Sequence, residues 1–442
     1  MYTVLSLEGT HALIMGLGLS LAIIAFLHTE AALFLLIASM LFSPEFIVAG
    51  TEAGLDFQGR GVTLRGDDFL IVIIGLTWFV KTSIYKELNL IGASLLNPAI
   101  GFYAVACLLS TLIGAVSGNL QLLPGMMFAL KYIEYFVLYY LVINNLRDLR
   151  HANSLLAVAV ATALIVSVVA SLQIPAGGRV TAPFEGEHGE PNTLGGYLLM
   201  MMMMCLAIGL FAPRRRIKIL FLACAGVMLL PFIYSLSRSA YLGLIPALIV
   251  LLWLSRNRTL ALLLVGAIWV VILFPSVVPQ PVTDRISFTF TQPLHQQQVT
   301  VLGRRLDTST SARLASFEMA YEAFQDRPVL GWGITGWRFI DSMYVRTLVE
   351  LGLVGALAFL YLIASCYRVG WAAFRYFKDH GLYRGIAAGY LAALTGFLFH
   401  AIGSNTFIIV RIMEPFWLLT GMLAVLPTIG ASAGILPYQE GE

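Results

Sequence analysis

The sequence is poor in charged residues. Only 12% of its 442 residues are Asp, Glu, Lys or Arg, whereas 59% are hydrophobic. A soluble domain has about 25% charged and about 45–50% apolar residues. Because the share of surface that a core buries saturates with chain length, a soluble fold could not hide this much apolar surface. Lipid must therefore surround much of the chain. The net charge of only +3 gives no indication of a nucleic-acid partner.

Cysteines and basic N-terminal residues are scarce too. The four cysteines are Cys107, Cys205, Cys224 and Cys366. All lie in apolar runs without metal-ligand spacing, which predicts small hydrophobic side chains rather than a disulfide framework. The N-terminus lacks the basic stretch of a signal peptide, so the first apolar segments are expected to act as uncleaved insertion signals.

Long apolar runs are abundant. Segments long enough to cross a bilayer, about 20 residues each, are placed at 11–28, 31–50, 67–84, 97–116, 126–144, 152–174, 191–212, 217–236, 239–254, 259–275, 346–369, 384–404 and 406–427. The first two are weak, and Ser43-Pro44-Glu45 interrupts the second. Backbone polar groups inside a bilayer need internal partners. The expected fold is therefore an all-α polytopic membrane protein with 12–13 transmembrane helices and one large extracytoplasmic loop that contains an amphipathic helix.

Basic residues between the spans predict the orientation. The clusters are Arg147 with Arg150, Arg214 to Arg216 with Lys218, Arg256 with Arg258, and Arg368, Arg375, Lys378 and Arg384. All fall on one side, which the positive-inside rule assigns to the cytoplasm. We therefore expect an N-terminal transmembrane bundle at 1–275, an extracytoplasmic loop at 276–345, and C-terminal transmembrane helices with a short cytoplasmic tail at 346–442.

The long loop is the most unusual segment. A helix is predicted from Ser309 to Gln325, with Leu314, Phe317, Tyr321 and Phe324 on one face. Such a helix can lie along the membrane surface. Long loops without a fold of their own are usually functional or disordered. We expect this loop to carry the active site. Gly331, Gly333 and Gly336 within it fit G-x-G-x-x-G, but no strand–helix unit surrounds them, so they predict no dinucleotide site.

Arginines gather on the predicted outer side: Arg179, Arg238, Arg304, Arg305, Arg313, Arg338 and Arg346. This excess runs against the positive-inside trend, and the planar guanidinium suits phosphate. It predicts an anionic, phosphate-bearing substrate. The alternative is that individual arginines pair with lipid headgroups or with Asp307, Asp326 and Asp341. That alternative is weakest for Arg238, which lies in a Ser-Arg-Ser turn between two spans.

Two further segments hold candidate acid–base groups. Glu185, Glu187, His188 and Glu190 precede a helix with Pro191 in its first turn. They suit substrate binding, a divalent metal or a solvated acidic loop, and their spacing matches no metal template. Asp341, which is close in sequence to Arg338, is a candidate general base for a sugar hydroxyl. The alternative is that Asp341 caps the following helix or forms an ion pair.

Two pairs of opposite charge lie within predicted spans: Lys131 with Glu134, and Arg411 with Glu414. The spacing of three residues favours neutralised pairs on one helix face. A proton or ion path is the alternative, because intramembrane charges are costly and often functional.

Several motifs occur together in one order: LRGDD at 64–68, the stretch from Arg179 to Asn192, SRSA at 237–240, and the block from Ser311 to Gly355. That block reads SARLASFEMAYEAFQDRPVLGWGITGWRF and then DSMYVRTLVELGLVG. In this order the chain resembles the O-antigen ligase and O-antigen polymerase (Wzy-C-like) family of bacterial envelope glycosyltransferases. The resemblance covers about Leu64 to Gly421, and its most specific part is the last block.

The resemblance implies a metal-independent, C-type (GT-C) glycosyltransferase without a cofactor. Its donor would be an undecaprenyl-pyrophosphate-linked oligosaccharide at the periplasmic face of the bacterial inner membrane. By position, Arg179, Arg238 and Arg313 match the family's arginines. The ligases usually carry His-Asn where this chain has Asp341-Ser342, and this departure favours a polymerase of O-antigen or exopolysaccharide repeat units. A ligase that transfers finished glycan is the alternative, as is a lipid-linked glycan transporter, although no half-to-half repeat is evident. A cell-wall transglycosylase fits the SRSA turn and the Glu190-Pro191-Asn192 stretch less well.

The resulting site hypothesis has two groups. The predicted catalytic residues are Asp341, Arg238 and Arg313. The predicted binding residues for pyrophosphate and glycan are Arg179, His188, Glu190, Asn192, Arg338, Tyr344 and Glu350. No metal and no nucleic acid is expected. The expected partners are the lipid-linked oligosaccharide, membrane lipid and, as an optional addition, a chain-length regulator.

Overall fold

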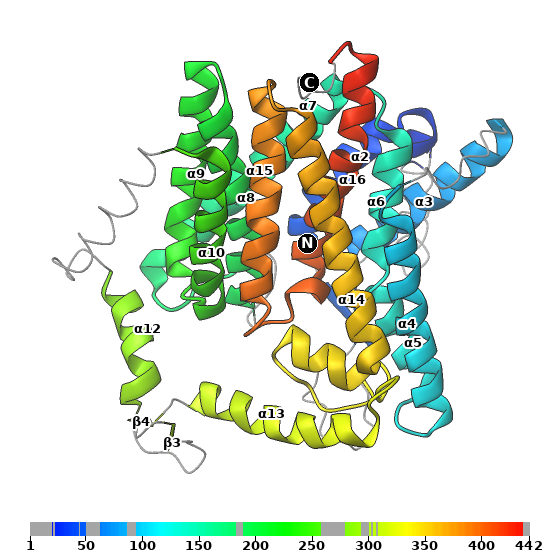
Figure 1. The fold of residues 1–442 in the computed structure, drawn as a ribbon, viewed down its shortest axis with the longest axis vertical. Coiled ribbons are helices and arrows are strands. Elements are labelled where there is room, and N and C mark those ends of the chain that lie inside the picture. Colours follow the sequence, from blue (N-terminus) through cyan, green and yellow to red (C-terminus); the bar gives the residue numbers. More distant parts are fainter. Residues whose placement is uncertain are drawn as a thin grey trace, which may run out of the picture.

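A computed structural model describes residues 20, 23–43, 45–49, 62–85, 94–182, 189–257, 279–292, 300–301, 304–305 and 308–435. The main body is a bundle of long helices that run roughly side by side (Figure 1). The helices are α2 (Thr29–Phe42), α3 (Gly66–Tyr85), α4 (Asn97–Val116), α5 (Leu122–Lys131), α6 (Glu134–Asn145), α7 (Leu149–Ser171), α8 (Pro191–Phe211), α9 (Arg215–Tyr234), α10 (Arg238–Ser255), α12 (Gln280–Thr291), α13 (Thr308–Asp326), α14 (Met343–Tyr376), α15 (Gly381–His400) and α16 (Val410–Ser432).

Short elements connect these helices. The single-turn helices are η1 (Ile174–Ala176) and η3 (Thr406–Ile408). Strand β1 (Glu45–Ala49) pairs antiparallel with β2 (Val62–Arg65), and β3 (Thr300–Val301) pairs antiparallel with β4 (Arg304–Arg305). The described strands form two small hairpins, and the rest of the described structure is mainly helical.

The expected fold class is confirmed. Within the described ranges, nine helical segments are long and apolar enough to cross a membrane: α4, α5 with α6, α7 with η1, α8, α9, α10, α14, α15 and α16. Helix α3, which matches the expected span at 67–84, has 20 residues. The spans expected at 11–28 and 259–275 fall mostly or wholly outside the described residues. The total of 12–13 spans stays a prediction.

Two expected spans differ from the structure. The one placed at 31–50 ends as a helix at Phe42, and the chain continues into strand β1. Ser43 has an extended backbone, with ψ 128°, because a residue before proline avoids the helical region. The span placed at 126–144 consists of two helices, since Tyr132 and Ile133 separate α5 from α6.

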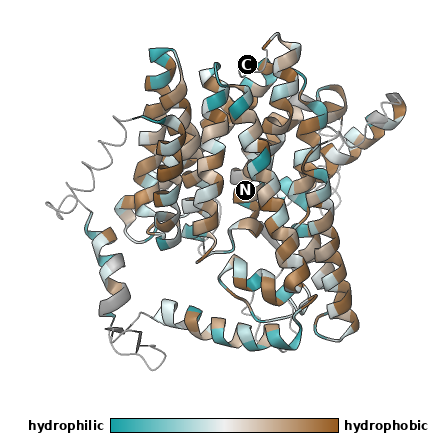
Figure 2. Ribbon diagram, in the orientation of Figure 1, coloured by the Kyte–Doolittle hydropathy of each residue, from teal (hydrophilic) through white to brown (hydrophobic). Residues whose placement is uncertain are grey.

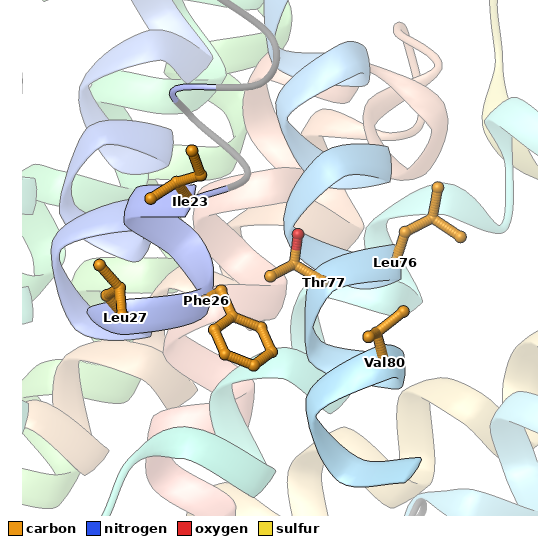
Figure 3. Close-up of a pocket in the computed structure, with 6 residues that line it drawn as sticks. All are labelled: Ile23, Phe26, Leu27, Leu76, Thr77 and Val80. Carbon is orange, nitrogen blue, oxygen red and sulfur yellow. The ribbon is translucent and has the colours of Figure 1, made fainter. Parts of the chain in front are cut away.

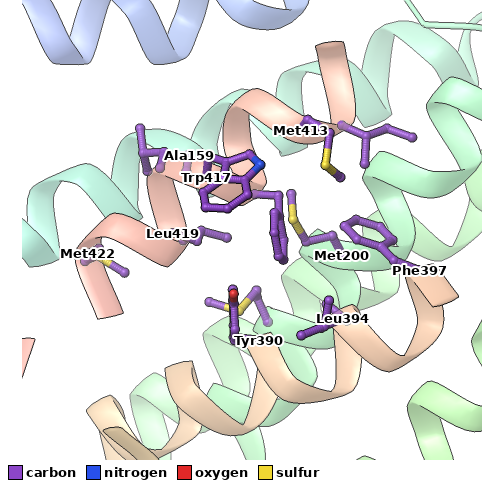
Figure 4. Close-up of a cluster of buried hydrophobic side chains, with 14 of the residues drawn as sticks. Ala159, Met200, Tyr390, Leu394, Phe397, Met413, Trp417, Leu419 and Met422 are labelled. Carbon is purple, nitrogen blue, oxygen red and sulfur yellow. The ribbon is translucent and has the colours of Figure 1, made fainter. Parts of the chain in front are cut away.

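Helix α8 lies at the centre of the core. Within its apolar window 83% of the residues are buried, compared with 28% for α9. A helix that is apolar on all sides belongs in the interior, and the run from Met200 to Met204 is buried there. Figure 4 shows Met200 and Met413 among the rings of Tyr390, Phe397 and Trp417. Unbranched methionines fill the irregular gaps between such rings.

Small residues allow the helices around α8 to approach closely. A Cβ atom at Gly243 of α10 would lie 2.5 Å from the carbonyl oxygen of Gly396 on α15. Close contact through small residues is how helices associate where lipid removes the hydrophobic driving force. Hydrophobic residues predominate along the helices of the bundle, as the colouring in Figure 2 shows. Helices from both ends of the chain share one core.

The bundle has two different ends. We call the end that carries α12, α13 and the segment before α14 the loop end (Figure 1). The connections α8–α9 and α14–α15 meet at the opposite end, where the guanidinium of Arg384 lies 5.5 Å from the ring centre of Phe211. Several of the basic residues named above lie in or beside these two connections. This separation agrees with the orientation predicted from the positive-inside rule.

An apolar groove lies between the helical segment 23–27 and α3 (Figure 3). Its lining residues are Ile23, Phe26, Leu27, Leu76, Thr77 and Val80. The hydroxyl of Thr77 donates to the carbonyl of Ile73 at 2.6 Å, within its own helix. The groove therefore suits a hydrocarbon chain and offers no group for binding phosphate.

Candidate functional site

Helix α14 is interrupted near the loop end. Gly352 has φ 65° and ψ −164°, a conformation that is essentially restricted to glycine. Backbone groups that an interruption frees within a membrane protein need other partners. The preceding loop supplies them. The amide of Leu353 donates to the carbonyl of Pro328 at 2.8 Å, and the amide of Gly333 donates to the carbonyl of Glu350 at 2.9 Å. The segment PVLGWG at 328–333 thus pairs through its backbone with the segment ELGLVG at 350–355.

Replacement of Gly352 by alanine tests this pairing. A Cβ atom there would lie 2.4 Å from the carbonyl carbon and oxygen of Val329. Because any residue other than glycine is also strained in this backbone conformation, we expect the free energy of unfolding to fall by about 2–3 kcal/mol or more. The fall is measured as a lower unfolding temperature in detergent. Gly226→Ala on α9 is the matched control, because no atom lies within 4 Å of its Cβ position. Equal unfolding temperatures for the two variants would contradict the prediction.

Arg313 and Asp341 form an ion pair at the loop end. A guanidinium nitrogen of Arg313 on α13 lies 2.7 Å from a carboxylate oxygen of Asp341, and the two side chains are 26% and 33% exposed. The pair is therefore accessible to a substrate. Of the two alternatives to catalysis predicted for Asp341, the ion pair is present. The N-cap position of α14 is Ser342 instead.

The backbone around Asp341 is held on both sides by the connection between α15 and α16. The side-chain amide of Asn405 donates to the carbonyl of Ile340 at 2.9 Å. The amide of Met343 donates to the carbonyl of Ala401 at 3.1 Å. These contacts fix the position of the carboxylate relative to the helices, although it lies at the end of a long loop.

Arg179 lies beside the Ser-Arg-Ser turn that begins α10. Its guanidinium donates to the carbonyls of Ser235 at 3.3 Å and Leu236 at 3.4 Å. The amide of Val180 also donates to the carbonyl of Tyr234 at 3.1 Å. The stretch around residue 180 therefore lies beside residues 234–236, just before α10. The two motifs at 179–192 and 237–240 are thus close enough to form one site.

Three other arginines lie near enough to Arg179 to act on its charge. Desolvation by the surrounding protein and the positive charges of Arg285, Arg238 and Arg313 lower the pKa of Arg179 to about 10. The side chain is still exposed, and at neutral pH it is protonated. The four guanidiniums, which we call the arginine cluster, form a concentrated positive site. Such a site attracts an anion with several charges.

Arg285 was missed by the sequence reasoning. It is the only basic residue of α12, a helix that the sequence did not predict. The sequence singles out arginines that lie in recognisable motifs, and Arg285 belongs to none of them. Its position near Arg179 depends on how α12 lies below α9 and α10 (Figure 1).

Asn192 contacts the arginine turn, whereas no such contact is described for the predicted residues that precede it. Its side-chain oxygen accepts a hydrogen bond from the hydroxyl of Ser237 at 2.7 Å, which connects the start of α8 to the arginine turn. Glu190 occupies the N-cap position of α8. His188, Glu185 and Glu187 lie outside the described residues, so the substrate-binding, metal and solvated-loop alternatives for that segment stay open.

Three predicted binding residues have other contacts. The ion pair of Asp341 is with Arg313 and not with Arg338, whose guanidinium lies 3.7 Å from the sulfur of Met319. The hydroxyl of Tyr344 donates to the carbonyl of Leu398 at 2.5 Å. Glu350 is buried and accepts from Arg346 at 3.0 Å, from the amide of Thr335 at 3.2 Å and from Tyr132 at 3.3 Å. These contacts hold the loop against α14, and the role of Glu350 in substrate binding stays a prediction.

Helix α13 has the expected bounds to within one residue at each end, and it packs on the protein through alanines. Tyr321 is 64% exposed, whereas Ala320 and Ala323 are buried against Ile340 and Val349. The alanines face inward because α13 packs closely on the loop and on α14. Larger apolar side chains such as Tyr321 and Met319 are exposed instead. The exposed Tyr321 is available to a membrane surface, and the prediction that the face with Leu314, Phe317, Tyr321 and Phe324 lies along the membrane stays a prediction.

The fold and the site define a multi-pass helical membrane protein with a guanidinium-rich, carboxylate-containing centre at one end. Residues 223–360 match the family model of the O-antigen ligases. This match confirms the resemblance to the O-antigen ligase (Wzy-C-like) family. The matched region includes Arg238, Arg285, Arg313 and Asp341. No curated protein matches the chain.

Proposed function

We propose that the protein is a C-type glycosyltransferase that polymerises glycan repeat units carried on undecaprenyl pyrophosphate. The observation that carries this proposal is the convergence of Arg179, Arg238, Arg285 and Arg313 next to Asp341. The match to the O-antigen ligase family supports a glycosyltransferase-like activity and a lipid-linked glycan substrate.

The arginine cluster suits the leaving group. In the proposed reaction the bond between the anomeric carbon and the pyrophosphate oxygen breaks, and negative charge grows on that oxygen. Preorganised guanidiniums stabilise such charge most effectively where it develops. Because the cluster lies at the end of the helices, the pyrophosphate can bind there while the lipid tail extends along the bundle.

Asp341 suits the acceptor side of the reaction. Its carboxylate, which lies 2.7 Å from the guanidinium of Arg313, can accept the proton of the attacking sugar hydroxyl. The same pair links this base to the arginine cluster, so that acceptor and leaving group would be activated in one place. We propose Arg238 and Arg313 as catalytic residues together with Asp341, and Arg179, Arg285 and Asn192 as pyrophosphate-binding residues.

Asp341-Ser342 favours a polymerase within the family. Through the resemblance, a ligase is expected to carry His-Asn at this position. A ligase that transfers finished glycan to a different acceptor is the second candidate, since the matching family is that of the O-antigen ligases. We place the protein in the bacterial inner membrane with the loop end facing the periplasm. The segregation of basic connections to the opposite end supports this orientation.

An assay with purified protein tests the proposal. An undecaprenyl-pyrophosphate-linked repeat unit is supplied as the sole substrate, and products are separated by length. We expect a ladder of longer lipid-linked glycans. Transfer only after a second acceptor is added would identify a ligase. The absence of turnover with matched sugars in both assays would contradict the transferase and favour a lipid-linked glycan transporter.

A further inference from the structure

The connection between α15 and α16, residues 401–409, is buried although it links two helices at the loop end (Figure 1). Thr406 and Phe407 are 0% and 5% exposed, whereas connecting segments usually run over the surface. A ring nitrogen of His400 lies 2.6 Å from the hydroxyl oxygen of Thr406, and the hydroxyl of Tyr135 donates to the carbonyl of Phe407 at 2.8 Å. These buried polar contacts give the connection one preferred conformation.

The connection bonds to the backbone on both sides of Asp341. The side-chain amide of Asn405, a residue that is 6% exposed, donates to the carbonyl of Ile340 at 2.9 Å. The amide of Met343 donates to the carbonyl of Ala401 at 3.1 Å. The proposed base therefore cannot shift relative to the helices without breaking one of these two hydrogen bonds.

The same connection also bonds to the Ser-Arg-Ser turn. The hydroxyl of Ser239, which directly follows Arg238, donates to the carbonyl of Gly403 at 3.0 Å. A Cβ atom at Gly403 would lie 2.9 Å from the hydroxyl oxygen of Ser239, so a larger residue there would push the two segments apart. Gly403 lies between Ala401 and Asn405 in the sequence. One short buried element thus contacts the segments of both Arg238 and Asp341.

Glycosyl transfer depends on the spacing of these two segments. The base must reach the acceptor hydroxyl while the guanidinium reaches the pyrophosphate, and a misplacement of about 1 Å can slow a reaction about 100-fold. Groups that react must therefore be held by a supporting layer of packed and hydrogen-bonded residues. The α15–α16 connection has the burial and the contacts of such a support.

We propose that Asn405 and Ser239 are positioning residues, which act through the α15–α16 connection to hold Asp341 and Arg238 at one spacing. The inference rests on the proposed function, because that function assigns Asp341 to the acceptor hydroxyl and Arg238 to the pyrophosphate. Asn405 lies outside the residues that match the family model, so the match gives it no role.

Asn405→Ala tests the first of these roles. The rate of a single turnover is measured with purified full-length protein in detergent, over a range of concentrations of a radiolabelled undecaprenyl-pyrophosphate-linked repeat unit. We expect the maximal rate to fall about 10- to 100-fold. The donor concentration for half-maximal rate should change less than about 2-fold, because the arginines that bind the donor stay in place. Asn144→Ala is the matched control and should react like the wild type, since the side chain of Asn144 donates to the carbonyl of Tyr140 within its own helix at 2.7 Å.

A second background separates positioning from a purely structural role. The variant Asp341→Asn lacks the base, so adding Asn405→Ala to it should change the rate less than about 2-fold. A residue that served only the stability of the fold would lower the rate by the same factor in both backgrounds, because it would reduce the fraction of folded protein. That equal factor, or a wild-type rate for Asn405→Ala, overturns the positioning role of Asn405.

Ser239→Ala is the second variant, and it decides the question if Asn405→Ala does not fold. It removes one hydroxyl, should lower the maximal rate in the same direction, and should have less than about a 2-fold effect when Arg238→Ala is already present. An undiminished rate for Asp341→Asn itself would refute the proposed base, and the positioning role of Asn405 with it. A slow Asp341→Asn beside wild-type rates for Asn405→Ala and Ser239→Ala would overturn the positioning roles alone.

Discussion

Replacing Arg313 by alanine is expected to reduce formation of longer lipid-linked glycans about 100- to 1000-fold, while the protein still inserts into the membrane. The size follows from the loss of one preorganised donor to developing negative charge. Arg313 both contributes to the arginine cluster and lies 2.7 Å from Asp341, so its loss affects both halves of the proposed reaction. Arg238→Ala should have an effect of similar size through the pyrophosphate alone.

Matched variants separate charge from geometry. Arg313→Lys keeps the charge but loses the planar pair of donors, so it should recover only part of the activity. Arg215→Ala removes an exposed arginine at the opposite end of the bundle and should leave polymer length unchanged. Wild-type chain length from Arg313→Ala or Arg238→Ala would remove that arginine from the proposed catalytic centre.

The spans were predictable because hydrophobic length is a local property. The expected span at 97–116 coincides with α4, and the basic connections lie at one end as expected. The errors come from competing local effects. Helix α2 ends at Phe42 although the sequence stays hydrophobic beyond it, whereas α5 and α6 together still form the span expected at 126–144. Periodicity could not identify the buried face of α13 either, since tight packing favours Ala320 and Ala323 over the larger Tyr321.

The site was predictable only as far as the motifs reach. Arg179, Arg238 and Arg313 come together as expected, because each belongs to a segment that the resemblance marks. The pairing of Asp341 with Arg313, 28 residues away, is a tertiary contact. Sequence proximity suggested Arg338 instead. The place of Arg285 near Arg179 likewise becomes visible only when the helices are packed together.

Replacing Asp341 by asparagine should slow transfer about 100- to 10,000-fold while the lipid-linked donor still binds. The amide has nearly the same shape as the carboxylate but cannot accept the proton of the acceptor hydroxyl. The measurement is the turnover rate and the donor KM of the purified variant. A fall in kcat with an unchanged KM identifies Asp341 as the base.

The same measurement distinguishes catalysis from a purely structural role. If Asp341 served only to position Arg313, its loss would lower kcat no further than Arg313→Ala does, because Arg313 acts on charge that develops in the transition state. Asp326→Asn, at the exposed end of α13, is the matched control and should turn over like the wild type. Undiminished turnover by Asp341→Asn would mean that the base is another group, and the carboxylates at 185–190 would then be tested next. A large fall in kcat for Asp341→Asn alone would instead assign the proton transfer to the carboxylate beside Arg313, which is where the acceptor hydroxyl must approach the sugar–pyrophosphate bond.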